Sequence, residues 1–125
     1  VECHLRPLIN GGKSDIMLDM VDVKQEIFKG SKRLDEASRE IFKLARAKAE
    51  TEMEYRIALT KEMVKLKEKG MAITMIQDVA RGNVAELKYK RDLADVTYQA
   101  GRDSLRAIQT QLSSLQSILR SQEEM

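Results

Sequence analysis

Few residues in this chain have the types and spacing that catalysis requires. Cys3 and His4 could provide a thiol and a base, but adjacent side chains rarely converge and no third group orients the histidine. Glu50, Glu52 and Glu54 are spaced by two, which scatters them around a helix, whereas a metal site in a helical bundle combines inward carboxylates with histidine. We therefore expect no catalytic residue, no metal site and no cofactor.

A phosphate-binding loop is not indicated either. Arg81, Gly82 and Asn83 precede a predicted helix, and the free backbone amides of a helix N-terminus can hold an anion. However, one glycine without a Gly-x-x-x-x-Gly-Lys pattern is typical of an ordinary helix start. The sequence therefore favours a protein that is not an enzyme.

Basic residues gather around an apolar connection between two predicted helices. Residues 61–92 hold eight cationic and five anionic side chains, a local excess of three positive charges. A contact surface for a macromolecular partner is the expected role of this region. The residues predicted to form it are Met71, Ile73, Met75, Ile76, Arg81, Lys88 and Lys90. We favour a protein partner over a nucleic acid, because no aromatic residue in the connection offers a surface for base stacking.

The C-terminal third of the chain is expected to be one long helix, over residues 83–121. From Val84 to Leu119, apolar residues recur at alternating steps of three and four, which is the spacing of a coiled-coil-like helix. Arg91 and Gly101 occupy the two remaining positions of this row, and we expect Arg91 to extend its charged end to solvent. Asn83, followed three residues later by a glutamate, is typical of a helix N-terminus.

A second apolar row predicts the first helix, over residues 15–69, after an irregular arm at residues 1–14. The row passes through Gly30 without losing its phase, which favours one continuous helix at a cost of about 1 kcal/mol relative to alanine. The alternative is a short helix that ends at Gly30 and a second one capped by Ser31. Gly70 follows a run of lysines and is the expected left-handed residue after the last turn.

The predicted connection, residues 70–82, is short relative to the helices. It is compatible with a helical turn over 74–80 or with an extended segment. A short connection favours an antiparallel helical hairpin, so we predict one all-α, coiled-coil-like domain over residues 15–125. With the reversal centred on the connection, residue n is expected opposite about 152 − n, which pairs Gly101 with Thr51.

That register leaves the start of the first helix without an intrachain partner. Apolar residues there are expected to form an association surface, or else to be covered by the arm folding back. A further apolar row on the C-terminal helix, which includes Leu93 and Val96, also indicates self-association. We predict a homo-oligomer, most simply a dimer that forms a four-helix bundle. The residues expected in this contact are Ile16, Met20, Val23 and Ile27.

The composition agrees with this architecture. Charged residues make up 34% of the 125 residues and aromatic residues 4%, which suits a surface-rich helical protein and argues against a β-sandwich or barrel. A net charge of +2 is too small to imply nucleic-acid binding by itself. The single cysteine fits a reducing compartment, and no apolar stretch approaches the roughly 20 residues that span a bilayer. We therefore expect a cytoplasmic protein without a membrane partner.

The segment from about residue 40 to residue 124 resembles small uncharacterised helical proteins encoded by phages and prophages of Gram-positive bacteria. The likeness is strongest at residues 80–83 (ARGN), at residues 90–92 (KRD) and in the Leu-Gln-Ser-Ile stretch near the C-terminus. The resemblance implies a phage-type accessory protein and transfers no catalytic residue. Our leading hypothesis is a non-enzymatic interaction or assembly protein that docks a partner through the end of the hairpin. The alternative is a nucleic-acid-binding accessory factor in phage DNA replication or recombination.

Overall fold

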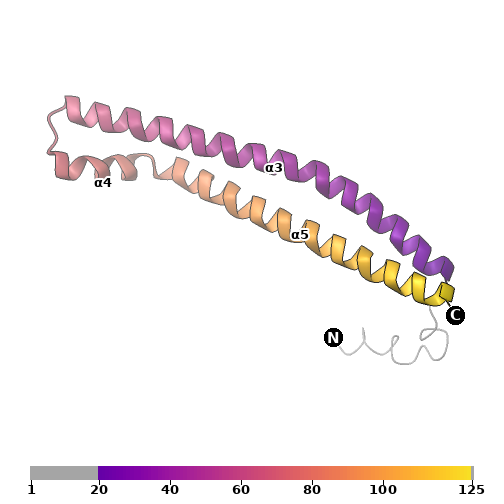
Figure 1. Cartoon of the computed structure of the whole chain (residues 1–125). Helices are drawn as coiled ribbons and strands as arrows, with labels where there is room; N and C mark the ends of the chain where they lie inside the picture. The colour runs from indigo at the N-terminus through magenta and orange to yellow at the C-terminus, as the bar shows by residue number, and fades with distance from the viewer. Residues whose placement is uncertain (1–19, 125) are drawn as a thin grey trace, which may run out of the picture. The chain divides into compact units, whose positions relative to one another are not determined.

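The computed structural model describes residues 20–124, and this part of the chain is all-α, with no strand among the described residues (Figure 1). The predicted arm over residues 1–14 and the expected first turn at residues 15–19 lie outside the described residues. The helices are α3 (Met20–Glu68), α4 (Ile73–Asn83) and α5 (Ala85–Glu124).

The described residues fall into two compact units. The terminal unit combines residues 20–35 of α3 with residues 106–124 of α5. The central unit spans residues 36–105 and contains the rest of both helices together with α4. In each unit, side chains of α3 contact side chains of α5.

In the terminal unit, α3 passes through Gly30 without interruption, as the phase of the apolar row predicted. A Cβ atom on Gly30 would lie 2.5 Å from Leu112 Cδ2 and 3.2 Å from Leu112 Cγ. Nearby, Arg33 Nη2 donates a hydrogen bond to Gln111 Oε1 at 3.0 Å. Glycine is therefore favoured at position 30 because the buried Leu112 packs directly onto the α3 backbone there.

The end of α3 confirms the role predicted for Gly70. Its φ of 87° is left-handed, and its N–H donates to Lys67 O at 3.0 Å. The N–H of Met71 donates to Leu66 O at 3.2 Å, which completes a Schellman motif. Met71 also packs against the cluster that contains Leu66, the apolar contact that commonly accompanies this motif. The chain therefore reverses direction over residues 69–72.

Residues 73–83 form the 11-residue helix α4, whereas the sequence analysis assigned residues 70–82 to a connection with a helical turn over 74–80 or an extended segment. The helix forms because Ile76 and Ala80, one turn apart, pack against Leu66 at the end of α3. Burial of this cluster outweighs the low helix propensity of Gly82 near the end of α4.

The break between α4 and α5 is a single residue, Val84, with φ −111° and ψ 22°. We expected Asn83 to begin the second helix, but it is the last residue of α4. Its side-chain amide donates to Glu62 Oε1 on α3 at 2.7 Å. Val84 is buried, so the break is fixed by side-chain packing and by this contact across to α3.

The pairing of Gly101 with Thr51 is wrong. In the central unit, a Cβ atom on Gly101 would lie 2.7 Å from Leu44 Cδ1 and 3.1 Å from Ile41 Cδ1. Gly101 therefore lies about two turns closer to the start of α3 than its predicted partner.

Two ion pairs in the central unit give the same register between α3 and α5. Lys48 Nζ lies 3.1 Å from Asp95 Oδ1, and Arg91 Nε lies 3.5 Å from Glu52 Oε2. The two residue numbers add up to 143 in both pairs, so residue n lies opposite about residue 143 − n rather than 152 − n. The register differs because the chain reverses at residues 69–72, so that α4 already runs back toward α5 instead of forming part of the reversal.

Candidate docking surface

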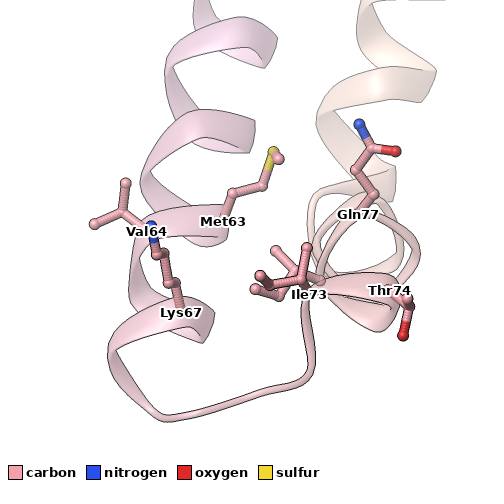
Figure 2. Close-up of a pocket in the computed structure, with 7 residues that line it drawn as sticks. Met63, Val64, Lys67, Ile73, Thr74 and Gln77 are labelled. Atoms are coloured by element: carbon pink, nitrogen blue, oxygen red, sulfur yellow. The ribbon is translucent and has the colours of Figure 1, made fainter.

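An apolar hollow of about 470 Å³ lies between the end of α3 and the start of α4 (Figure 2). Figure 2 shows Met63 and Ile73 on the facing sides of the two helices, whereas Thr74 turns away from α3. The residues labelled around the hollow are Met63, Val64 and Lys67 from α3 and Ile73, Thr74 and Gln77 from α4. The hollow is open to solvent and most of its wall is aliphatic, so it can take up an apolar side chain but offers no set of groups for catalysis.

The four apolar residues predicted for the partner surface have different roles in the structure. Ile73 is 81% exposed and Met75 is 55% exposed. Ile76 is only 6% exposed and belongs to the core, against which Met71 packs half-buried. Ile73 and Ile76 both line the hollow, Ile73 from its open side and Ile76 from the core. The accessible apolar residues at the hollow are therefore Ile73 and Val64, of which the sequence analysis missed Val64, whereas Met75 is exposed but does not line the hollow.

The basic residues predicted for the surface are all exposed, but none of them lines the hollow. Lys88 Nζ lies 3.2 Å from Asp92 Oδ2, so its charge is already paired within α5. Arg81 and Lys90 are exposed. The cation that lines the hollow is Lys67, which belongs to the lysine-rich end of α3.

Arg91 does not extend into solvent as we expected. Its guanidinium lies 4.4 Å from the centroid of the Tyr55 ring, which is the arrangement of a cation–π contact. Its Nη2 lies 2.9 Å from Asp92 Oδ1, and its Nε lies 3.5 Å from Glu52 Oε2. Arg91 can therefore occupy a position in the apolar row because Tyr55 covers its flat face and two carboxylates neutralise its charge.

The hydrogen bond from Arg91 lowers the pKa of the Asp92 carboxyl, and the hydrogen bond from Lys88 lowers it further. The same contact with Asp92 raises the pKa of Arg91. Arg91 and Asp92, with Lys48, Glu52 and Asp95, line a second hollow of about 420 Å³ in the central unit. Because the hollow is lined by charges that pair with one another, we assign it a structural role.

Replacing Arg91 by alanine should raise the pKa of Asp92 toward the ordinary value of an aspartate. A carboxyl whose pKa is lowered by folding stabilises the fold above its unfolded-state pKa, and this contribution disappears as the pH falls through the folded-state pKa. The measurement is an NMR titration of the Asp92 side-chain carboxyl carbon. Arg102→Ala is the matched control, because Arg102 lies over the Tyr98 ring instead and should leave the titration unchanged. An unaltered Asp92 pKa in Arg91→Ala would contradict the assigned pair.

The residues predicted to contact a second copy are wholly or partly buried within a single chain where the structure describes them. Val23 is 2% exposed, so its side chain is not available to a partner. Met20 and Ile27 are half-buried, and Ile16 lies outside the described residues. The prediction relied on the 152 − n register, whereas the contact of Gly30 with Leu112 places residue n opposite about 142 − n in the terminal unit. This register removes most of the unpaired overhang.

Two further properties of the described residues bear on function. Residues 20–124 contain no group of three or more His, Cys, Asp or Glu side chains close enough to hold a metal ion. None of the described helices has the length and apolar character needed to cross a membrane.

Comparisons of the chain with protein families, with characterised proteins and with solved structures find no match. Inferences about function therefore depend on the geometry of the described residues.

Proposed function

We propose that this chain is a non-enzymatic interaction protein, an antiparallel helical hairpin that docks a protein partner through its tip. The tip is defined here as residues 61–77, which comprise the end of α3, the reversal and the start of α4. The hairpin arrangement is supported by the contacts of α3 with α5, which pair residues in opposite order along the chain. The observation that carries the docking proposal is the pair of exposed apolar residues Val64 and Ile73, which line an aliphatic hollow.

Charge at the tip indicates the chemistry of the partner. Four lysines lie in the last turns of α3 and the following residue, and none of them has an ion-pair partner among the described residues: Lys61, Lys65, Lys67 and Lys69. The acidic residues of the tip, Glu62 and Glu68, offset only part of this charge. We therefore expect an acidic amphipathic helix, with an apolar side chain in the hollow and carboxylates facing the lysines.

A displayed library of amphipathic helical peptides with glutamates on the polar face tests this proposal. Peptides selected by the unaltered chain should bind Ile73→Asp at least about 10-fold more weakly, because the substitution places a carboxylate in the hollow. Leu93→Asp is the matched control, since Leu93 is an exposed apolar residue of α5 and should leave binding unchanged. Equal selection from a library with lysines on the polar face would contradict the proposed chemistry.

The nucleic-acid alternative has weaker support in the geometry. Lys88 and Arg91 are ion-paired to Asp92, so part of the basic cluster is neutralised within the chain. Fluorescence anisotropy with a DNA duplex and a single-stranded RNA at low salt tests it. Affinity that falls steeply with salt and is lost in Lys88→Glu/Lys90→Glu would replace the protein-partner proposal.

Three further expectations belong to this proposal. The chain is a phage-type accessory factor, as its resemblance implies. It is located in the cytoplasm. It self-associates as a homodimer, which is supported by apolar side chains that stay exposed on α3, including Phe42, Met53 and Ile57.

A further inference from the structure

The central unit presents a second apolar face, on the side of α3 away from α5. Phe42 is 75% exposed, Met53 55% and Ile57 48%, although all three are large apolar residues. Together with Arg46 and the exposed Ala49, they follow one another at steps of four, three, four and four, so they form one stripe along the helix. A stripe with this period fits another helix packed along it.

Four of the five stripe residues, from Phe42 to Met53, are related by a twofold axis, whereas Ile57 extends the stripe beyond the related part. Reversing its direction about a point between Ala47 and Lys48 places Phe42 opposite Met53 and Arg46 opposite Ala49. A second copy of α3, antiparallel to the first, would then present the same side chains in the same places. The thioether of Met53 would lie against the Phe42 ring, a favourable contact that would occur twice in a twofold dimer. Small Ala49 would let the two backbones approach closely.

Charge along the stripe selects the antiparallel orientation. Residues 39–46 hold three cations and one carboxylate, whereas residues 50–56 hold Glu50 and Glu54 besides Glu52, which is already paired with Arg56 and Arg91. An antiparallel partner would bring each half against the half of opposite charge, while a parallel partner in register would bring like charges together. Arg39, Arg46, Glu50 and Glu54 have no ion-pair partner in the described part of the chain, so they are free to pair across the interface.

We propose that the chain dimerises through the outer face of α3, with Phe42–Met53 of one copy packed antiparallel on Phe42–Met53 of the other. The occupant of this face is a second copy because both the apolar pattern and the charge pattern are self-complementary. Arg46 would pair with Glu50 of the other copy. Lys43, which lies 3.6 Å from Glu40 in the single chain, would exchange that partner for Glu54 of the other copy. The inference rests on the proposed homodimer and states which surface forms it. It is independent of the docking at the tip.

Sedimentation equilibrium of the full chain at micromolar concentrations tests the apolar contact. Phe42→Glu should weaken the dimer at least about 30-fold in Kd, the effect of losing an interface hot spot. Phe42 is exposed in the single chain, so the helical circular dichroism of the Phe42→Glu variant should equal that of the unaltered chain. Val96→Glu is the matched control on α5 and should leave the dimer intact. Loss of the dimer in Val96→Glu but not in Phe42→Glu would overturn the inference and leave the homodimer itself in place.

Charge exchange tests the orientation. Lys43→Glu/Arg46→Glu should weaken the dimer at least about 10-fold, because four carboxylates would then meet at each end of the stripe. Glu50→Lys/Glu54→Lys should weaken it similarly. The chain with all four substitutions should dimerise again, and so should an equal mixture of the two double variants. Unchanged dimers in both double variants would overturn the antiparallel contact, and a monomer in the unaltered chain would overturn the homodimer as well.

Discussion

Ile76→Asp should lower the free energy of unfolding by roughly 3–5 kcal/mol, the range found when a large buried side chain is lost and a carboxylate takes its place. Ile76 is 6% exposed and packs with Leu66 and Ala80. The substitution removes the contact that holds α4 against the end of α3. Urea unfolding followed by circular dichroism measures the loss, and hydrogen exchange of the α4 amides locates it.

Ile73→Asp is the control for this experiment. The same substitution three residues earlier lies at an exposed position and should change the unfolding free energy by no more than about 0.5 kcal/mol. The two variants have the same composition, so any difference between them reports the position of the side chain. Equal unfolding midpoints would contradict the assignment of Ile76 to the core and of Ile73 to the surface.

Gly30→Val should lower the free energy of unfolding by roughly 2 kcal/mol, which is a typical cost of overpacking. Even the Cβ atom would lie 2.5 Å from Leu112 Cδ2, and the branched side chain adds two methyl groups at this contact. Gly101→Val should have a similar effect in the central unit, where Leu44 and Ile41 lie against the glycine. Thermal unfolding of each variant provides the measurement.

Gly82→Val is the matched control, because nothing lies within 4 Å of the Cβ position at Gly82. Valine has a somewhat higher helix propensity than glycine, so this variant should be neutral or slightly more stable. A loss of stability at Gly82 equal to the loss at Gly30 would mean that backbone effects, and not the contact with α5, explain the glycines.

Local chemistry in the sequence was sufficient to predict several features of the fold. Gly70 was recognisable because a left-handed glycine after a lysine-rich turn is a common helix ending, and its φ of 87° confirms it. The continuity of α3 through Gly30 followed from the phase of the apolar row, which a chain break would have shifted. Both features depend on residues close together in the sequence.

The register between α3 and α5 could not be obtained in this way. It depends on where the chain reverses, and the sequence analysis treated all of residues 70–82 as the reversal. Ile76 and Ala80 are one turn apart, which was a signal for a helix, but burial against Leu66 was needed to decide it. The error of about two turns then displaced the predicted partner of Gly101 and created an overhang at Val23 that the structure does not have.

The same dependence explains what was missed at the tip and at Arg91. The apolar period of α4 alone does not tell which of Ile73 and Ile76 is buried, because both lie near one face of the helix. Only the end of α3, which covers Ile76, decides it. Val64 was not recognised because its exposure follows from the packing of its neighbour Met63 toward α4 (Figure 2). The contacts of Arg91 with the Tyr55 ring and Glu52 could be recognised only once the observed register was known.

The antiparallel contact of α3 with α5 is the basis of the proposed hairpin, and cross-linking tests it most directly. In a Cys3→Ser chain, Lys48→Cys/Asp95→Cys should be joined within one molecule by a short bismaleimide, because Lys48 Nζ and Asp95 Oδ1 lie 3.1 Å apart. The pair Lys48→Cys/Ser104→Cys, which the 152 − n register would bring together, should not be joined within one molecule. Efficient intramolecular cross-linking of the second pair but not the first would contradict the reversal at residues 69–72, and with it the proposed hairpin.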